Sequence, residues 1–269
     1  MVYTIQKAMF YGGKNMLLAI DVGNTNTVLG IFDGEKEISH FRITTNITRT
    51  SDETGMLFLQ YFASCGVDKK DITDVIIASV VPPVMYSLEH AIRKYLGITP
   101  MVVGPGTKTG INIKYDNPRE VGADRIVNAV AAYNKYGGPI IIVDFGTATT
   151  FCVVNETGDY LGGVICAGIK VSMDALVSKT SKLPRVEILK PQSVIGKTTV
   201  SSMQSGAVYG YVGQVENIIR KINEELGVKT KVIATGGLAG MIANETDVID
   251  VVERSLTLEG LRIIYEKNK

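Results

Sequence analysis

The chain contains one short sequence pattern twice. Residues 17–30 read LLAIDVGNTNTVLG, and residues 140–153 read IIIVDFGTATTFCV. In both, an apolar run ends in an aspartate, a turn of small residues follows, and a second apolar run begins. Short apolar runs bounded by turn residues are typical of buried strands, and two such runs around Gly, Asn and Thr predict a hairpin. We therefore expect two similar domains that hold one ligand between them.

The two predicted turns have the chemistry of a phosphate site. Gly23 and Gly146 lack a Cβ, so the backbone can approach a ligand closely, and successive N–H groups in a turn bind anions. A carboxylate repels phosphate unless a cation lies between them, so Asp21 and Asp144 indicate bridging metal ions. Side-chain hydrogen bonds are offered by Asn24, Thr25, Thr147, Thr149 and Thr150. Each aspartate alone is equally consistent with simple stabilisation of a turn, but the repetition favours the phosphate site.

A third element follows later in the chain. Residues 231–240 read KVIATGGLAG, a short strand that ends in a glycine pair. Gly236 and Gly237 would allow the backbone to approach a flat ligand such as a nucleobase. Alone, this pattern fits any strand-to-helix turn; after two phosphate-type turns it indicates a nucleotide.

In this combination the chain resembles the acetate/sugar kinase–Hsp70–actin superfamily. Residues 21–25 are similar to its first phosphate motif, 144–147 to its second, and 235–238 to its adenosine motif. Within the superfamily the chain resembles the type III pantothenate kinase family from Met16 to near the C-terminus. The segments that carry this resemblance are DVGNTNT at 21–27, GADR at 122–125, DFGTATT at 144–150, GG at 162–163, KLP at 182–184 and GKTT at 196–199.

The resemblance implies an α/β fold of two duplicated ribonuclease H-like domains, the actin-like ATPase fold, with ATP in the cleft between them. It implies ATP-dependent phosphorylation of pantothenate to 4'-phosphopantothenate, the first step of coenzyme A synthesis. It also implies ATP with Mg²⁺, a monovalent cation (K⁺ or NH₄⁺), and a homodimer with the active site near its interface. We expect an N-terminal extension or tag at 1–15, and actin-like domains at 16–133 and 134–269.

A kinase of this kind needs a base for the acceptor hydroxyl, and a positioned carboxylate can take that proton. The sequence predicts that Asp124 lies in the first turn of a helix capped by Asn117, where the helix dipole favours the ionised form. From the local sequence alone, the simpler interpretation is that Asp124 only complements this dipole while Arg125 forms a surface pair. The match to the family's GADR motif favours Asp124 as the proton acceptor.

The resemblance assigns roles to the other site residues, with Thr199 contributing across the dimer interface. Asp144 is expected to hold the monovalent cation, and Asp21 to orient the phosphates through Mg²⁺. The pantothenate pocket is assigned to Tyr115, Gly122, Ala123, Asp124, Arg125 and Thr199. The nucleotide site is assigned to Asp21, Val22, Gly23, Asn24, Thr25, Asn26, Thr27, Val28, Thr147, Gly236 and Gly237.

Composition sets bounds on these expectations. A chain of 269 residues is long enough for two domains, and 45% hydrophobic residues support packed cores. A net charge of +1 lacks the basic excess typical of nucleic-acid binding, and no apolar run reaches the roughly 20 residues of a membrane helix. The three cysteines, Cys65, Cys152 and Cys166, lack metal-type spacing and suit a reducing compartment. We expect a cytoplasmic protein without nucleic-acid or membrane partners.

Two helices are well signalled. Thr50 and Glu53 have the spacing of a capping box, which predicts a helix through Phe62. A long helix is predicted at 199–226, and its small residues Gly206, Gly210 and Gly213 permit close approach of another helix. That neighbour is either a second copy of the chain or an element of the same domain.

Three other functions share parts of this pattern. Another small-molecule kinase or a phosphatase of the superfamily would have both phosphate turns but lack the GADR segment. A non-catalytic, nucleotide-bound accessory or regulatory protein would be favoured by loss of Asp124, which is present. An actin-like polymer would be longer, with inserted subdomains. Fold alone does not separate these functions; the substrate-side residues do.

Overall fold

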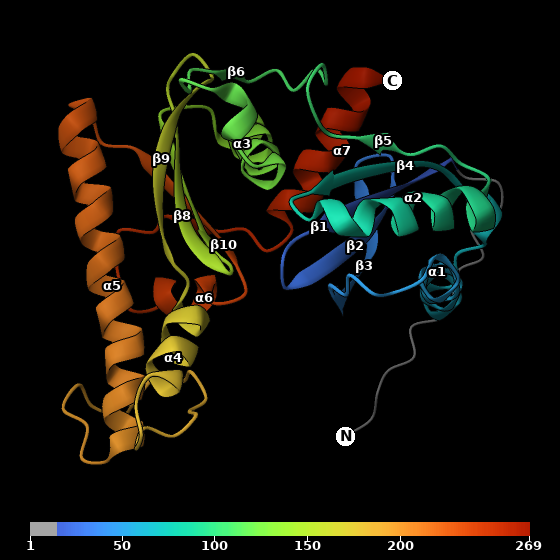
Figure 1. Cartoon of the computed structure of the whole chain (residues 1–269). Helices are drawn as coiled ribbons and strands as arrows, with labels where there is room; N and C mark the ends of the chain where they lie inside the picture. Colours follow the sequence, from blue (N-terminus) through green and yellow to red (C-terminus); the bar gives the residue numbers. More distant parts are fainter. Residues whose placement is uncertain (1–14) are drawn as a thin grey trace. The chain divides into compact units, whose positions relative to one another are not determined.

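A computed structural model describes residues 15–269 of the chain (Figure 1). The extension or tag predicted for residues 1–15 lies, apart from Asn15, outside the described residues. Among the helices that the structure describes, none is both long and apolar enough to cross a membrane.

The described chain divides into two compact units. Unit 1 contains residues 15–109, 121–127 and 257–269, and unit 2 contains residues 110–120 and 128–256. This division differs from a single boundary near residue 134, because the C-terminal segment packs against the first sheet. A Cβ on Gly30 would lie 2.8 Å from the Leu258 side chain, and Leu258 and Leu261 are buried. The C-terminal helix therefore completes unit 1.

Unit 1 is built on a five-stranded mixed sheet in the order β3-β2-β1-β4-β5. β1, β2 and β3 are successive antiparallel strands, and β4 and β5 continue the sheet parallel to β1. β1 is buried along its length except at Asp21, as expected for an apolar run between two neighbouring strands. The strands are β1 (Met16–Val22), β2 (Asn26–Asp33), β3 (Lys36–Thr44), β4 (Ile72–Ser79) and β5 (Met101–Val102).

The predicted helix start at Thr50 is confirmed. Thr50 and Glu53 form the capping box: the Thr50 hydroxyl accepts from the Glu53 N–H, and the Glu53 carboxylate accepts from the Thr50 N–H. Pro82 opens the helix that follows β4, where its missing N–H costs nothing. The helices are α1 (Ser51–Cys65), the 3-10 turn η1 (Lys69–Asp71), α2 (Pro82–Leu96) and α7 (Leu256–Asn268).

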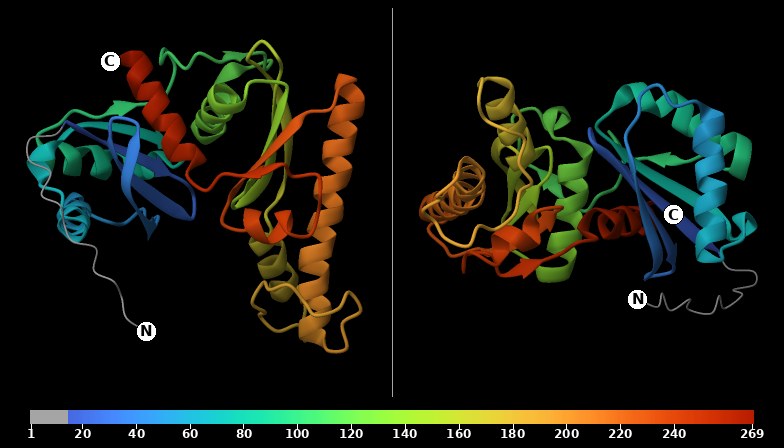
Figure 2. Two further views of the ribbon diagram at one scale, coloured as in Figure 1. Left: turned by 180° about the vertical axis from the view of Figure 1, so that it is seen from behind. Right: turned by 90° about the horizontal axis from the view of Figure 1, so that it is seen from below.

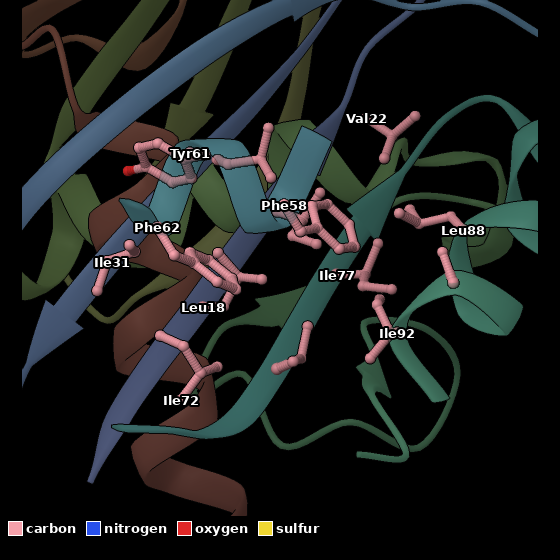
Figure 3. Packing of buried hydrophobic residues seen from close by; sticks show 14 of the residues in the cluster. Leu18, Val22, Ile31, Phe58, Tyr61, Phe62, Ile72, Ile77, Leu88 and Ile92 are labelled. Carbon is pink, nitrogen blue, oxygen red and sulfur yellow. The ribbon is translucent and has the colours of Figure 1, made fainter. Parts of the chain in front are cut away.

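The core of unit 1 lies between the sheet and helices α1 and α2. Phe58, Phe62 and Leu88 point toward Leu18 and Ile77 of the sheet (Figure 3). Burying each such side chain stabilises the fold by about 1.5–3 kcal/mol. This core anchors β1 and hence the turn that follows it.

Unit 2 repeats the same sheet. Its order is β11-β10-β7-β8-β9-β6, with β7, β8 and β9 antiparallel and β10 and β11 parallel to β7. Read in the reverse direction, the strands β9-β8-β7-β10-β11 correspond in order and direction to β3-β2-β1-β4-β5 of unit 1. β6 is an additional strand beside β9. The strands are β6 (Asn112–Ile113), β7 (Ile140–Phe145), β8 (Ala148–Val154), β9 (Asp159–Ala167), β10 (Lys231–Gly236) and β11 (Val251–Val252). The predicted duplicated ribonuclease H-like α/β fold is confirmed.

Helices α3 and α5 lie on opposite sides of the second sheet (Figures 1 and 2). From α5, Ala207, Val215 and Ile219 join the core with Phe151 of the sheet. The helices are α3 (Ala123–Tyr136), which begins in unit 1, α4 (Ile169–Ser178), α5 (Thr199–Leu226) and α6 (Ala239–Ala243). α5 has the predicted limits, because Thr198 caps its first turn and Gly227 ends it in the left-handed region.

The predicted start of α3 is wrong in one respect. Residues 118–120 form a separate 3-10 turn, η2 (Pro118–Glu120), and the Asn117 side chain accepts from Arg119 N–H within that turn at 3.3 Å. The first helical bond of α3 goes instead to the Gly122 carbonyl, from Ile126 N–H at 3.2 Å. Asp124 nevertheless lies in the first turn of α3, as predicted.

The small residues of α5 do not pack closely within the chain. A Cβ added to Gly206, Gly210 or Gly213 would meet no atom within 4 Å. Of the two alternatives for this face, close packing inside unit 2 is thus ruled out for the described residues.

Candidate functional site: two phosphate-type turns and an acidic helix start

The first hairpin turn, turn 1 (residues 23–26), follows Asp21 in unit 1. Asp21 is half-buried and its strand pairs with β2 on one side and β4 on the other, so its backbone is fixed. The N–H of Gly23 donates to the Asn26 carbonyl at 3.0 Å and closes the turn. The Gly23 amide is therefore used within the protein, and any contact to phosphate must come from the residues after it.

A residue that the sequence analysis did not single out holds this turn. Thr45, directly after β3, donates its hydroxyl proton to the Gly23 carbonyl at 2.7 Å and its N–H to the Thr25 carbonyl at 3.0 Å. Its hydroxyl also lies 2.9 Å from that of Thr27. Since a threonine hydroxyl has a single proton, and that of Thr45 goes to Gly23, Thr27 is the donor in this pair. Thr27 is 7% exposed and supports the turn from inside.

The neighbouring residues of turn 1 differ in exposure. Asn24, Thr25 and Asn26 are exposed, which suits the predicted contacts to a nucleotide. Val22 has a fully buried side chain in the core of unit 1, and its carbonyl accepts from Val80 N–H at 3.1 Å. Val28 is half-buried.

The second hairpin turn, turn 2 (residues 146–148), follows Asp144 in unit 2 and is one residue shorter. The N–H of Gly146 donates to the Ala148 carbonyl at 3.0 Å, and the N–H of Gly168, directly after β9, donates to the Thr147 carbonyl at 3.0 Å. Thr147 is exposed, whereas Thr149 is fully buried. A Cβ on Gly168 would lie 2.4 Å from the Gly146 and Thr147 carbonyl oxygens, so only glycine fits there.

The Asp144 carboxylate is held between two parts of unit 2. The side-chain amide of Asn128, a buried residue of α3, donates to Asp144 Oδ2 at 3.3 Å. On the other side, a Cβ on Gly236 would lie 2.7 Å from Asp144 Oδ1 and 2.6 Å from the Phe145 carbonyl oxygen. Gly236 has φ +96°, which residues with side chains rarely adopt. Asp144 Oδ1 and the Phe145 carbonyl thus present two oxygens beside the end of β10.

The two glycines after β10 have different surroundings. Gly236 is required by its backbone and by the Asp144 carboxylate, whereas a Cβ on Gly237 would meet no atom within 4 Å. Gly237 has a φ outside the left-handed region. Open space at Gly237 is what close approach of a flat ligand needs.

The GADR segment forms the first turn of α3. Asp124 is half-buried, and its Oδ1 accepts from the N–H of Arg125 at 2.8 Å. A Cβ on Gly122 would lie 2.5 Å from Asp124 Oδ1. Glycine at 122 therefore leaves the room that the carboxylate occupies over the start of the helix, where the helix dipole favours its charge. Ala123 and Arg125 are also half-buried.

Tyr115 and Thr199 belong to unit 2 but are not brought together within it. Tyr115 follows β6, and its ring lies 3.5 Å from the Cβ position of Gly162 in the first half of β9. Thr199 opens α5, whose start lies beside α4 and at the opposite end of unit 2 from β6 (Figures 1 and 2). Thr199 is exposed and lines a groove of about 790 Å³. Other residues of this groove are Met173, Leu176, Lys197, Met203 and Tyr211.

Residues 17–221 match the family model of type III pantothenate kinases. The chain belongs to this family.

Solved structures share the fold at low identity. A conserved putative Baf family transcriptional activator from Campylobacter jejuni is 19% identical with a TM-score of 0.58, over 93% of this chain and 98% of that one. A putative 2-dehydro-3-deoxygalactonokinase from Sinorhizobium meliloti is 11% identical with a TM-score of 0.53, over 93% and 96%. The ethanolamine utilization protein EutJ from Carboxydothermus hydrogenoformans is 10% identical with a TM-score of 0.53, over 94% and 90%. These likenesses show the fold alone.

As a member of a kinase family, the chain is a phosphotransferase that binds ATP with a divalent metal and a small-molecule acceptor. No group of three or more His, Cys, Asp or Glu residues that could hold a metal ion occurs in the described part of the chain. Mg²⁺ usually keeps several waters and is held by one or two carboxylates together with substrate phosphates. Asp21 and Asp144, half-buried near the ends of apolar strands, are residues of the right kind.

Sequence reasoning missed Thr45 and Gly168, which hold the two turns, and Asn128, which holds the Asp144 carboxylate. Asn128 had a usable signal, because it is a polar residue within the apolar stretch 126–132 and follows Asp124 by four positions on one helix face. Thr45 and Gly168 had none, since their roles arise from contacts with turns far away in the sequence.

Proposed function

We propose that this kinase transfers the γ-phosphate of ATP to the primary hydroxyl of pantothenate, giving 4'-phosphopantothenate in the first step of coenzyme A synthesis. The family match supports this substrate. The observation that carries it is the GADR turn, where Gly122 leaves room for the Asp124 carboxylate at the start of α3.

In the proposed reaction, the Asp124 carboxylate accepts the proton of the pantothenate hydroxyl as that oxygen bonds to the γ-phosphorus. The bond from the γ-phosphorus to the bridging oxygen breaks, and ADP leaves. Arg125 and Tyr115 are proposed to bind pantothenate, whose carboxylate and amide suit a cation and a hydroxyl. Mg²⁺, when bound, neutralises charge on the phosphates.

The two turns are proposed to divide the nucleotide between them. Asn24, Thr25 and Thr147 supply hydrogen bonds to the phosphates, and Gly237 leaves space for the adenosine. Asp21 is proposed to hold the Mg²⁺-bound phosphates. Asp144 is proposed to hold K⁺ or NH₄⁺. This is supported by the Phe145 carbonyl oxygen, which lies on the same side of Gly236 as Asp144 Oδ1 and would be a second oxygen ligand. A monovalent cation prefers such a set of carboxylate and carbonyl oxygens.

We also propose a homodimer in which Thr199 enters the pocket of the other copy. Thr199 and β6 lie at opposite ends of unit 2 (Figure 1), so one copy does not bring Thr199 to its own Tyr115. The glycine face of α5 is open, and Val194 and Ile195 near the start of α5 are exposed apolar residues. The mass of the purified protein from light scattering tests this state; a monomer would contradict it.

The deciding experiment is ATP-dependent formation of phosphopantothenate in potassium and in sodium buffer, by wild type and by Asp124→Asn. We expect turnover that depends on potassium and falls by about 10²–10⁴-fold in the variant, the usual contribution of a general base. Circular dichroism and ATP binding of the variant serve as controls for folding. Absence of product with folded wild type in both buffers would remove pantothenate as the substrate and call for a screen of other acceptors. Nucleotide binding without turnover on any acceptor would favour an accessory or regulatory protein.

A further inference from the structure

We propose that Thr45 is a positioning residue for the phosphates of ATP, which acts by fixing the direction of the Asn24 N–H in turn 1. This inference rests on the proposed nucleotide role of turn 1 and adds a residue that lies outside the recognised motifs. Thr45 follows β3, eighteen positions beyond Thr27, and is half-buried.

The first step of the argument is the geometry of one peptide group. The Gly23 carbonyl and the Asn24 N–H belong to the same planar trans peptide, so they point in opposite directions. The Thr45 hydroxyl holds that carbonyl at 2.7 Å. The Asn24 N–H is consequently directed away from Thr45, and Asn24 is exposed. A fixed N–H on an exposed turn is the donor that a phosphate oxygen needs.

The second step is the support of Thr45 itself. Its N–H donates to the Thr25 carbonyl at 3.0 Å, so one residue holds two carbonyls of the same turn. The buried Thr27 donates to the Thr45 hydroxyl oxygen, which fixes that hydroxyl with its proton toward Gly23. The chain Thr27, Thr45, Gly23 uses each hydroxyl proton once and leaves no ambiguity in donor direction.

The third step is a comparison with unit 2, where Gly168 occupies the equivalent place after β9. Its N–H reaches the Thr147 carbonyl at 3.0 Å, as that of Thr45 reaches Thr25, but glycine has no hydroxyl to hold the Gly146 carbonyl. The side-chain bond is thus an addition of unit 1 to a shared backbone arrangement.

The test compares Thr45→Val, which removes the hydroxyl at constant shape and keeps the backbone N–H, with Thr45→Ser, which keeps the hydroxyl. Thr48→Val is the matched control, because the Thr48 hydroxyl donates to the Asn46 side chain in the same exposed segment and not to turn 1. Dissociation constants of Mg²⁺–ATP and of adenosine are measured by calorimetry on the full-length protein. Thermal unfolding of each variant is recorded alongside.

We expect Thr45→Val to weaken Mg²⁺–ATP binding by about tenfold, the effect of losing one hydrogen bond that orients a donor to a charged group, with adenosine binding unchanged. Thr45→Ser and Thr48→Val should stay within about twofold of wild type. Equal weakening of ATP and adenosine would indicate a general structural effect and overturn the proposal, as would unchanged ATP binding by Thr45→Val. Wild type that binds ATP but makes no phosphopantothenate would refute the proposed acceptor, while the comparison of ATP constants still decides the role of Thr45.

Discussion

Turn 1 and turn 2 occupy the same place in two copies of one sheet, yet they are closed differently. In both, the glycine after the aspartate-bearing strand donates to a carbonyl of its own turn, and the residue after the third strand donates its N–H to the turn. Turn 1 gains a side-chain bond from Thr45, whereas turn 2 excludes any side chain at Gly168. The two units therefore share the backbone hydrogen bonds that hold the turn, but differ in the side chain at the position after the third strand.

The two strands that run parallel to the aspartate strands, β4 and β10, also end in different residues. Ser79 pairs with Val22 in unit 1, and Gly236 pairs with Phe145 in unit 2. The Ser79 hydroxyl accepts from Val81 N–H at 3.1 Å, whereas Gly236 lies directly against the Asp144 carboxylate. In unit 2 this strand is followed by open space at Gly237. We attribute the adenosine side of the proposed site to unit 2 for this reason.

The largest effects should come from Asp21 and Asp144, because each is proposed to hold a cation that stabilises the phosphates. The two cations are proposed to be different. We expect Asp21→Asn and Asp144→Asn each to lower kcat/KM by about 10²-fold or more, since charge that stabilises the phosphates through a metal is lost. Asp21→Asn should raise the Mg²⁺ concentration needed for half activity, and Asp144→Asn the K⁺ concentration.

Steady-state kinetics over a range of both cations measure this difference. Glu35→Gln, at the exposed turn between β2 and β3, is the control and should behave as wild type. If both aspartate variants change the response to the same cation, the proposal that Asp21 acts on Mg²⁺ and Asp144 on K⁺ is wrong.

Intermediate effects should separate the two glycines around turn 2. Gly168→Ala places a Cβ against two backbone carbonyls, so we expect the free energy of unfolding to fall by about 1–3 kcal/mol. Gly146→Ala makes only ordinary contacts, the nearest at 3.5 Å, and should leave this free energy within about 0.5 kcal/mol. It should instead weaken ATP binding, because a methyl group then occupies the approach to the phosphates. Urea unfolding and ATP calorimetry of both variants measure this distinction. An equal loss of unfolding free energy in the two variants would contradict it.

The smallest effects should come from ion pairs away from both turns. In unit 2, burial opposes ionisation of Glu253, but hydrogen bonds from Lys135 and Tyr136 outweigh it and lower the pKa of Glu253 below its usual 4.5. A lowered pKa stabilises the fold above pH 4.5, and this contribution disappears as the pH falls through the folded-state pKa. Glu253→Gln should therefore cost about 1 kcal/mol or less at pH 7, and nothing at low pH.

Unfolding curves at several pH values measure this difference between Glu253→Gln and wild type. The exposed Asp52–Lys94 pair of unit 1 serves as the comparison, and Asp52→Asn should have a still smaller effect that salt removes. A loss for Glu253→Gln that persists unchanged at low pH would mean that packing, and not charge, explains the role of Glu253.

Local sequence signals predicted the elements that local forces decide. The capping box at Thr50 and Glu53 and the limits of α5 depend on neighbours within a few residues, and both predictions are confirmed. The cap at Asn117 is wrong, because two turns in succession compete for the same start and the sequence does not show which carbonyl receives the first helical bond.

By itself, the sequence determined that this protein repeats one hairpin, that each copy follows an apolar strand with an aspartate, and that a GADR segment opens a helix. Periodicity and turn chemistry suffice for such features, because they act over short distances along the chain. Only the tertiary structure decided which residues hold the turns and the Asp144 carboxylate: Thr45 and Gly168 come from the ends of third strands, and Asn128 from a helix on one side of the sheet. Strand pairing and helix packing bring these residues to their contacts. Because the contacts join residues far apart in the sequence, no local sequence pattern predicts them.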